Sequence, residues 1–571
     1  MKRFTLRLIL LLVLCSVLVS HPRINMAKAS GTIYIRADGL VDPPTAPIRR
    51  DGDTYAFIDN VHESIVVARS NIVIDGVGYA VEGDGGPESG SGFSLYNISN
   101  VIIKNTNIKG FTFGFHLELA SNNTISGNNI TANNLDGIRL YHSSNNAISG
   151  NNITKNNFDG IYLGSSSNNA ISGNNITKNG YGVRIIDFSN YNAVSGNNIT
   201  ANNLVGIYLG SSSNNAISGN NITANNLDGI RLYHSSNNAV SGNNITKNGY
   251  GIRVFYSSSN ILTGNCMADN DCNFGIGDGL TLSDFANDVD VSNTVDGNPV
   301  YYWINRQDVA VPFDAGYVAL VNCTRITIKN LNLTNNVQGL LLASTINSTI
   351  VENSVTDSCC GIYLYESSNN RFYHNNVIGN IQQVYVKTSG YANFWDDGYP
   401  SGGNYWSDYK DRYPDAAEID QSGIWNTQYF IDPDNVDNYP LTSPQSDTTP
   451  PTLSILSPEN KTYAASDVPL NFTLSEPTSW IGYSLDGQAN VTVGGNTTLS
   501  GLSDGSHTLT VYAKDMAGNA GTSERVCFSI DTQEAEPFPA WIVVAIVATT
   551  GVGVALLVYF VKVKKTTGKV K

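Results

Sequence analysis

The pentapeptide Gly-Asn-Asn-Ile-Thr recurs in the middle of this 571-residue chain, and each copy begins 23 residues after the one before it. A fixed period of about 20 to 50 residues is the signature of a solenoid, in which every repeat folds into one unit and stacks on its neighbours. This interval constrains the fold more tightly than length or composition does. The copies begin at Gly127, Gly150, Gly173, Gly196, Gly219 and Gly242.

Each period contains three short stretches, AISG, NNIT and DGIRLY, in which apolar residues alternate with small or polar ones. Short alternating stretches separated by Asn, Ser and Gly predict strands joined by turns. Coils of equal length stack such strands about 4.8 Å apart into long parallel sheets. The sequence therefore predicts an all-β chain whose main part is a right-handed parallel β-helix with three strands per coil. Ile130, Ile153 and Ile176 then share one interior column.

The repeated Asn residues are predicted to be structural. Burying four aliphatic side chains gains roughly 6–12 kcal/mol, whereas ordering each residue of a coil costs about 1–2 kcal/mol, so one coil is not stable alone. Stability must come from contacts between neighbouring coils. Asn tolerates left-handed turn conformations, and identical Asn residues in register form hydrogen-bonded ladders. Six of them also lie in Asn-Ile-Thr sequons, which are glycan acceptors of a secreted protein where they are exposed: Asn129, Asn152, Asn175, Asn198, Asn221 and Asn244.

Composition shifts outside the repeats divide the chain further. Weaker coils flank the repeats, Cys266, Trp303 and Pro312 interrupt the period, and a change to short strands with Gly-rich turns follows a Pro-rich linker. The predicted division is a signal peptide at 1–29, the β-helix at 30–390 with an insertion or irregular coils at about 266–316, an aromatic and acidic cap at 391–441, a linker at 442–450, an immunoglobulin-like β-sandwich at 451–532, a linker at 533–539, a transmembrane helix at 540–561 and a basic cytoplasmic tail at 562–571.

Both ends of the chain carry address signals. Lys2, Arg3 and Arg7 precede an apolar run, and Ala27-Lys28-Ala29 follows as a cleavage site, which is typical of a secretory signal peptide. A lipobox around Cys15 is the competing interpretation. The 22 uncharged residues 540–561 are long enough to span a bilayer, and five Lys residues follow them. We therefore expect a single-pass cell-membrane protein with its bulk outside the cell.

The charge balance excludes one class of partner. The chain has 33 Lys+Arg against 48 Asp+Glu, a net charge of -15, so nucleic acid is not expected as a partner. Six Cys residues remain after signal removal, too few for a disulfide scaffold, although a local Cys266–Cys272 bridge is one of the open pairings. His and Met do not cluster with these cysteines at the spacings of zinc or copper sites.

Several stretches together resemble a known family. They are GTIYIRADGLVDPP at the start, the SNNAISGNNIT coils, YYWINRQD, DAGYVALVNCTRITIKNLNLTNN, and WDDGYPSGGNYWSDY near 393–409. The chain is similar to the NosD-type β-helix proteins, above all archaeal surface members, over roughly 31–441. The resemblance implies a carbohydrate-binding or sugar-hydrolase-like β-helix. It also implies a copper-related periplasmic role as a further alternative, for which this sequence lacks the ligands.

One column of the predicted sheet offers a binding surface. Arginine and tyrosine occupy the outward position of the DGIRLY strand in successive coils, with Tyr and His two and three residues later in two of them. Residues 122–262 carry seven basic and four acidic side chains, so a polysaccharide of acidic sugars is the expected partner. The alternative is that the Arg and Tyr side chains only stack on each other as a solvated face. The candidates are Arg139, Tyr141, His142, Tyr162, Arg184, Tyr208, Arg231, Tyr233, His234 and Arg253.

Catalysis is the competing function. Asp136, Asp159 and Asp228 precede the same strand, and two carboxylates one coil apart have the spacing of glycosidase pairs, which suits a polysaccharide lyase, hydrolase or epimerase. However, residues 128–146 recur letter for letter at 220–238, and a binding ladder is copied more readily than an asymmetric catalytic centre. Non-catalytic binding or a structural role is therefore the favoured function. The acidic cap supplies calcium candidates, namely Asp396, Asp397 and Asp408.

Overall fold

The computed structural model describes residues 31–86, 89–277, 279–445, 450–476, 478–515 and 518–532. The chain divides into two units, residues 1–445 and residues 446–571. The predicted signal peptide, transmembrane helix and basic tail lie outside the described residues. Within the described ranges, no helix combines the length and the apolar character that crossing a bilayer requires.

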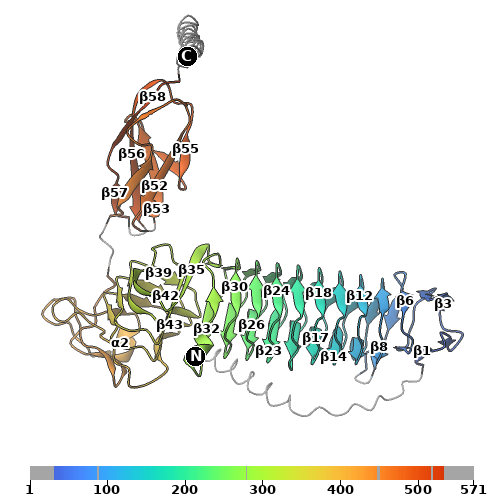
Figure 1. Ribbon diagram of the computed structural model, residues 1–571. Coiled ribbons are helices and arrows are strands. Elements are labelled where there is room, and N and C mark those ends of the chain that lie inside the picture. The colour runs from blue at the N-terminus through green and yellow to red at the C-terminus, as the bar shows by residue number, and fades with distance from the viewer. Residues whose placement is uncertain are drawn as a thin grey trace, which may run out of the picture. The chain divides into compact units, whose positions relative to one another are not determined.

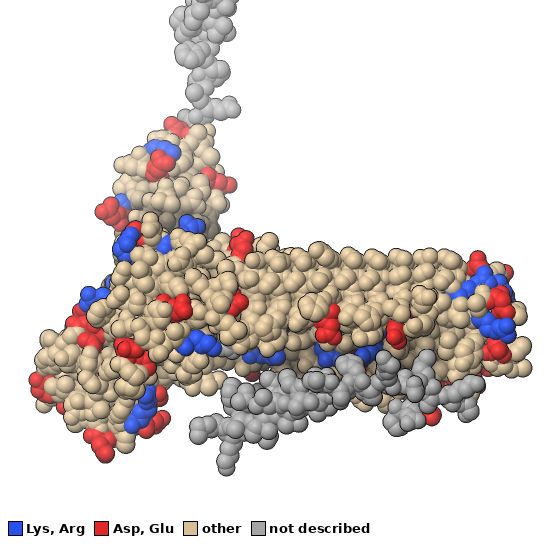
Figure 2. Space-filling model, turned by 60° about the horizontal axis from the view of Figure 1, so that its bottom comes forward, with Lys and Arg blue, Asp and Glu red and all other residues tan. Residues whose placement is uncertain are grey.

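Three parallel sheets wind around the first unit as a right-handed β-helix of about 15 turns, which confirms the predicted fold (Figure 1). Each regular coil contributes one strand to each sheet, in the order sheet A, sheet B, sheet C. The DGIRLY stretches form sheet A, the AIS stretches form sheet B, and the NIT stretches form sheet C. Charged side chains gather toward the two ends of the stack, and the middle coils present a mostly uncharged face (Figure 2).

Sheet A comprises β2 (Val41–Asp42), β1 (Ile33–Ile35), β5 (Ile65–Val67), β8 (Ser91–Tyr96), β11 (Phe113–Glu118), β14 (Ile138–Tyr141), β17 (Asp159–Gly164), β20 (Tyr181–Ile186), β23 (Ile207–Gly210), β26 (Asp228–Tyr233), β29 (Tyr250–Phe255) and β32 (Cys272–Gly277). Sheet B comprises β3 (Ile48–Asp51), β4 (Thr54–Phe57), β6 (Ile72–Asp75), β9 (Val101–Lys104), β12 (Thr124–Ser126), β15 (Ala147–Ser149), β18 (Ala170–Ser172), β21 (Ala193–Ser195), β24 (Ala216–Ser218), β27 (Ala239–Ser241), β30 (Ile261–Thr263) and β33 (Asp288–Val289). Sheet C begins with β7 (Ala80–Glu82), β10 (Asn107–Lys109), β13 (Asn129–Thr131), β16 (Asn152–Thr154), β19 (Asn175–Thr177), β22 (Asn198–Thr200), β25 (Asn221–Thr223), β28 (Asn244–Thr246), β31 (Cys266–Ala268) and β34 (Thr294–Val295).

The interior is a set of aliphatic columns. Ile130 pairs in register with Ile153, and Ile153 with Ile176, and all three are fully buried. The fixed period thus places like residues over like, as predicted. Alternation along each strand sends every second side chain inward, so each coil adds to one continuous core.

Buried Asn residues form the predicted ladders in the turns. The Asn174 side-chain amide donates to Oδ1 of Asn197 at 3.0 Å, and its own Oδ1 accepts the backbone N–H of Asn151 at 3.0 Å. The sequon Asn residues form a separate ladder on the outer face of sheet C, where Asn175 donates to Asn152 at 2.8 Å. Because Asn side chains satisfy backbone groups that the turns would otherwise bury, the repeated Asn stabilises the bends between sheets.

The regular coils continue past the predicted start of the irregular region. Met267 pairs with Ile245, and Phe274 pairs with Ile252, so residues 266–277 still form a coil. The residue types of the repeat change there, but the apolar spacing does not. Irregularity begins after Gly277, where the chain forms the 3-10 helix η2 (Leu282–Phe285) before rejoining sheet B.

A second stack of coils follows from residue 298. Its strands are β35 (Asn298–Ile304), β36 (Gln307–Ala310), β37 (Tyr317–Val321), β38 (Thr324–Lys329), β39 (Asn332–Thr334), β40 (Gln338–Ala343), β41 (Thr349–Val351), β42 (Ser354–Thr356), β43 (Cys360–Tyr365), β44 (Arg371–Tyr373), β45 (Asn376–Ile378), β46 (Gln382–Val386) and β47 (Tyr405–Trp406). β35 joins the second stack to sheet C through an antiparallel pair with β34. A disulfide between Cys272 and Cys359 links the two stacks, whereas Cys266 is free and exposed. The local Cys266–Cys272 pairing is therefore wrong.

Both ends of the unit are closed by irregular segments. At the N-terminal end, antiparallel hairpins β1–β2 and β3–β4 cover the edges of sheets A and B. At the C-terminal end lie α2 (Tyr409–Arg412) and the hairpin β48 (Tyr429–Asp432) with β49 (Asn435–Asp437). Trp406 stacks on Tyr429 there, and its indole Nε1 donates to the buried Asp437 at 2.9 Å. Such closure prevents an open sheet edge from pairing with another chain.

The second unit contains two β-sheets within its described residues. One contains β50 (Leu453–Ser457), β52 (Val468–Leu474) and β55 (Thr497–Leu499); the other contains β51 (Thr462–Tyr463), β58 (Val526–Ile530), β56 (Gly505–Asp515), β53 (Thr478–Leu485) and β54 (Val491–Val493), with β57 (Ala520–Thr522) paired to β56. Side chains of both sheets, including Phe472 and Val511, share one core. Its assignment as immunoglobulin-like stays a prediction.

Candidate functional site

The predicted Arg and Tyr side chains share one column on the outer face of sheet A. Strand pairing places Arg139 beside Tyr162, and Tyr162 beside Arg184, and the same register continues to the end of the sheet. This column, called the Arg/Tyr strip below, comprises Arg139, Tyr162, Arg184, Tyr208, Arg231 and Arg253.

Three buried aspartates accompany the strip. Asp136, Asp159 and Asp228 lie at the bend where each coil enters sheet A, and none exposes any surface. Asp136 accepts a hydrogen bond from Arg139 at 3.0 Å, and Asp159 pairs with Arg184 at 2.7 Å. Asp228 pairs with both Arg231 and Arg253. Each of the four arginines of the strip is therefore held by a carboxylate.

Aromatic rings fill the spaces between the guanidinium groups. The guanidinium carbon of Arg139 lies 4.4 Å from the ring centroid of Tyr162, and that of Arg184 lies 4.9 Å from the same ring on the other side. Arg184 also lies 4.6 Å from the ring of Phe158. The Arg and Tyr side chains therefore stack on one another, as the alternative interpretation of the column proposed.

Tyr162 and Arg184 are the most buried members of the strip, and the arginines at its two ends are partly exposed. Tyr162 is 2% exposed, and the side chain of Arg184 is 8% exposed. The side chains of Arg139, Arg231 and Arg253 are 15–19% exposed. A ligand in solution therefore reaches the arginines at the two ends of the strip, but not the central pair.

The half-buried Tyr141 and the exposed His142, Tyr233 and His234 lie next to these ends. Tyr141 and His142 pack edge to face at 4.2 Å beside Arg139. In the copied segment, Tyr233 is 38% exposed, and His234 stacks on Tyr256 at 4.8 Å. The second cluster has a third ring because the following coil supplies Tyr256, whereas the coil after the first copy has small residues there. Identical repeats thus present different surfaces.

The aspartates differ in their electrostatic surroundings. Burial raises the pKa of Asp159 to about 7, because the attraction of Arg184 is offset by the neighbouring Asp136. Burial acts on Asp228 in the same sense, but Arg231 and Arg253 outweigh it, and the pKa of this carboxyl is lowered. Burial, with Arg139 nearby, lowers the pKa of His116 to about 4.

Sequence reasoning missed the aromatic residues that close the strip. Tyr181 and Tyr250 take the place of Asp at the entry to their strands, in register with Asp159 and Asp228 respectively. The stretches KNGYGVR and KNGYGIR carried the signal, but each has one residue fewer before its strand than KNNFDGIY, so a fixed period does not align these rings. The other residues missed in this way are Phe113, Phe158 and His116, which packs in the same column as Arg139.

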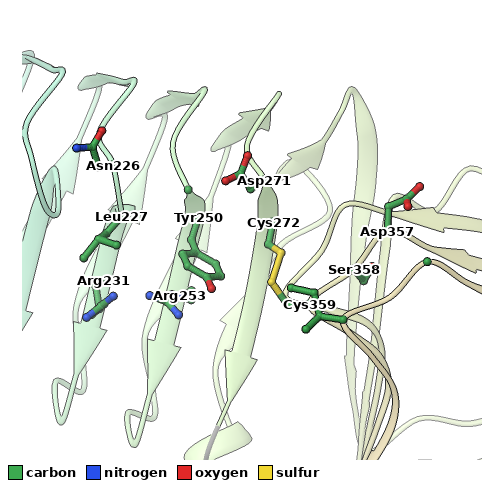
Figure 3. A pocket seen from close by; sticks show the side chains of 13 residues that line it. Asn226, Leu227, Arg231, Tyr250, Arg253, Asp271, Cys272, Asp357, Ser358 and Cys359 are labelled. Carbon is green, nitrogen blue, oxygen red and sulfur yellow. A yellow bond between two sulfur atoms is a disulfide. The ribbon is translucent and has the colours of Figure 1, made fainter. Parts of the chain in front are cut away.

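A pocket of about 350 Å³ lies at the C-terminal end of the strip. Figure 3 shows Arg231 and Arg253 on neighbouring strands, with Tyr250 and the disulfide of Cys272 beside them. The opposite wall comes from turns of the second stack, around Cys359 and Ile381. The strip therefore ends at a wall, which the sequence period alone does not reveal.

The calcium candidates do not converge. Asp396 accepts a hydrogen bond from the amide of Asn438, Asp397 pairs with Arg371, and Asp408 accepts a hydrogen bond from Tyr429. No group of three His, Cys, Asp or Glu side chains placed to share a metal ion occurs within the described part of the chain. The geometry therefore supplies no ready calcium cage at the cap.

Comparisons with known proteins give one family and several similar folds. The family model described as "Periplasmic copper-binding protein (NosD)" matches residues 54–204, 156–299 and 310–411. Halomucin of Haloquadratum walsbyi (strain DSM 16790 / HBSQ001) is 44% identical over 95 residues, which are 15% of this chain and 1% of halomucin. The chain thus spans only a small piece of that relative's length.

Solved structures with a similar fold include two enzymes whose names refer to a polysaccharide. The periplasmic alginate epimerase AlgG is 19% identical, with a TM-score of 0.28, over 59% of this chain and 83% of the epimerase. An exopolygalacturonase from Thermotoga maritima is 14% identical, with a TM-score of 0.36, over 47% of this chain and 82% of the enzyme.

The residues present do not fit a copper site within the described ranges. Copper prefers imidazole, thiolate and thioether ligands that converge on one point. His142 and His234 lie four coils apart, which is about 19 Å at the spacing of parallel strands. Met267 is buried in the core, and Cys272 is in a disulfide. No step of a mechanism is therefore assigned to copper.

Proposed function

Since the chain belongs to the NosD family, whose pattern covers most of its β-helix, we propose that it binds acidic polysaccharide at the cell surface without turning it over. The proposal includes the membrane anchor at residues 540–561, and it assigns the second unit the role of an immunoglobulin-like spacer. The secretory signal and the apolar run with its basic flank support this topology.

One observation carries the binding function: at each end of the Arg/Tyr strip, a partly exposed arginine lies near a tyrosine ring, half-buried at Tyr141 and exposed at Tyr233. Arg139 lies in the same strand as Tyr141, and Arg231 in the same strand as Tyr233. Aromatic faces pack against sugar rings, and guanidinium groups bind carboxylates. The two patches lie about 19 Å apart along the stack, since four coils separate them. A linear polymer spans that distance, whereas a small metabolite does not.

Burial of the aspartates favours binding over catalysis. A general acid or base must come within hydrogen-bond reach of the atom it protonates or deprotonates. Asp136, Asp159 and Asp228 expose no surface, and each is held by an arginine. Although the pKa of Asp159 is near neutrality, a sugar on the surface does not touch this carboxyl. Lyase, hydrolase or epimerase activity is the alternative function.

The test measures retention of the full-length protein, in detergent, on immobilised polygalacturonate and on neutral dextran. We expect binding to polygalacturonate only, weakening as salt rises. Tyr141→Ala combined with Tyr233→Ala should weaken it about tenfold, because both patches lose their ring. Tyr191→Ala removes another exposed ring, which lies off the strip, and should change nothing.

The outcomes separate the two functions. Equal retention of wild type and the double variant, or no retention of any acidic polymer, contradicts binding through the strip. Shortening of the polymer during incubation, measured by size, with loss of that activity in Asp159→Asn, identifies an enzyme instead.

A further inference from the structure

The pocket at the end of the strip has the form of a terminal subsite. Its near wall is the outer face of the last strands of sheet A, and its far wall consists of turns 357–359 and 379–381 of the second stack. The Cys272–Cys359 disulfide joins these walls. A chain lying along the strip therefore meets a barrier here, and about 350 Å³ holds about one or two sugar rings.

The near wall carries an unused hydrogen-bond donor. Arg231 contacts Asp228 through one terminal nitrogen, whereas its Nε is buried and has no hydrogen-bond partner within the described residues. A buried donor without a partner costs free energy that a ligand oxygen would recover. Arg253 also lines the pocket, and its guanidinium carbon lies 3.5 Å from the centroid of the Tyr250 ring. Two cations thus share one carboxylate, which leaves a net positive charge at this wall.

Opposite charges lie at other points of the pocket lining. Asp271 and Asp357 line it and are exposed, and Figure 3 shows both apart from the two arginines. Their charges are well screened by solvent, whereas the arginines are mostly buried. An anionic group therefore gains the most binding free energy next to Arg231, and it is repelled near Asp271 and Asp357.

We infer that this pocket binds the terminal acidic sugar of a polysaccharide chain, with its carboxylate on Arg231 and Arg253. The inference rests on the proposed function and adds that chain ends, rather than chain interiors, are recognised. The ring of Tyr233, two residues after Arg231, and the ring of Tyr256, three residues after Arg253, support the neighbouring sugar units.

Recognition of ends has a measurable stoichiometry. Full-length protein is titrated with polygalacturonate of high mass and with the same polymer partly hydrolysed to short chains, at equal mass of sugar. Binding of ends predicts that the bound protein increases in proportion to the number of chains. Binding of interiors predicts no such increase, and that result overturns the inference while leaving the proposed function intact. If neither preparation binds, the proposed function fails.

Two variants test the pocket itself. Ile381 is 67% exposed, so Ile381→Trp fills the pocket from its outer wall without disturbing the core, and it should weaken binding of trigalacturonate about tenfold. Ile261→Trp on the outer face of sheet B is the matched control. Asp271→Asn with Asp357→Asn should strengthen binding, most at low salt. Unchanged affinity in both variants, with trigalacturonate still bound, places the sugar elsewhere and overturns the inference.

Discussion

Asp159 shows how one residue's chemistry depends on the coil beside it. One of its carboxylate oxygens accepts hydrogen bonds from Arg184, while Oδ1 is buried without a partner within the described residues. Asp228 has two arginine partners and Asp159 has one, and Asp136 lies next to Asp159 with the same sign of charge. The same residue type at the same place in the repeat therefore has a raised pKa in one coil and a lowered pKa in another.

Asp159→Asn should remove a pH dependence of stability. The pKa of Asp159 is about 7 in the folded chain and 3.8 for an ordinary aspartate, so between about pH 4 and pH 7 the folded chain holds a proton that the unfolded chain has released. The free energy of unfolding should therefore fall as pH rises through this window and then level off. Urea unfolding at pH 4.5, 6 and 8 measures it. Burial also raises the pKa of Asp437 to about 7, and taking the difference in unfolding free energy between wild type and Asp159→Asn removes the contributions of His116 and Asp437. A difference that is constant with pH contradicts the assignment.

A buried ladder residue and its exposed neighbour offer a second comparison. Asn174→Ala removes the acceptor of the Asn151 backbone N–H and the donor to Asn197, and should lower the free energy of unfolding by roughly 2–4 kcal/mol. Asn175→Ala loses two exposed side-chain bonds, one donated to Asn152 and one accepted from Asn198, and should cost less than about 0.5 kcal/mol. Urea unfolding of both variants measures the contrast. Equal losses would show that the ladder in the turn does not stabilise the bend.

The period predicted which residues share a column, but not which of them are exposed. Ile130, Ile153 and Ile176 follow from the 23-residue interval, and so does the pairing of Arg139 with Tyr162. Exposure depends on rings such as that of Tyr181, which a shorter stretch before its strand shifts out of the 23-residue interval. Tyr162 is therefore buried although its strand places it on the outer face.

At the scale of the element, each coil behaves as an interchangeable unit. Successive strands of sheets B and C pair residue by residue in register, as in Ala147 with Ala170 and Asn152 with Asn175. A coil therefore contacts only its two neighbours, and stability is a sum of coil and interface contributions. The turn residues tolerate this copying because the same hydrogen bonds recur at every step.

Deleting one whole coil should preserve the fold. Removal of residues 151–173 joins Gly150 to Asn174 and restores the Gly-Asn-Asn-Ile-Thr sequence across the junction. We expect an unchanged far-ultraviolet circular dichroism shape per residue and a midpoint of thermal unfolding within a few degrees of wild type, about 2–4 °C. Removal of residues 151–162 breaks the register and should prevent folding. Folding of both deletions, or of neither, contradicts the stacking account.

At the scale of the first unit, the disulfide decides how the two stacks form one site. Cys272 is the first residue of β32, the last strand of sheet A. Cys359 lies in the second stack, 87 residues later. Between them the chain leaves the regular path through η2 and the β34–β35 hairpin. Nothing in the period relates these two cysteines, so the pairing and the pocket beside it required the three-dimensional arrangement.

Cys272→Ser combined with Cys359→Ser should loosen the second stack and open the pocket. A crosslink over 87 residues contributes about 3–4 kcal/mol by restricting the unfolded chain, and here it also holds the far wall of the pocket against sheet A. Hydrogen exchange should accelerate at residues 335–343, while residues 122–246 keep their protection, because the ladders of the regular coils are untouched. Cys266→Ser alters a free, exposed thiol in the preceding strand β31 of the same coil and is the matched control. Should residues 335–343 exchange at the wild-type rate in the double variant, backbone pairing alone holds the stacks together, and binding of trigalacturonate should then survive reduction of the disulfide. If exchange does accelerate, reduction of the disulfide should weaken trigalacturonate binding. The patch at Arg139 and Tyr141 should stay intact, which distinguishes a loosened pocket wall from loss of the whole strip.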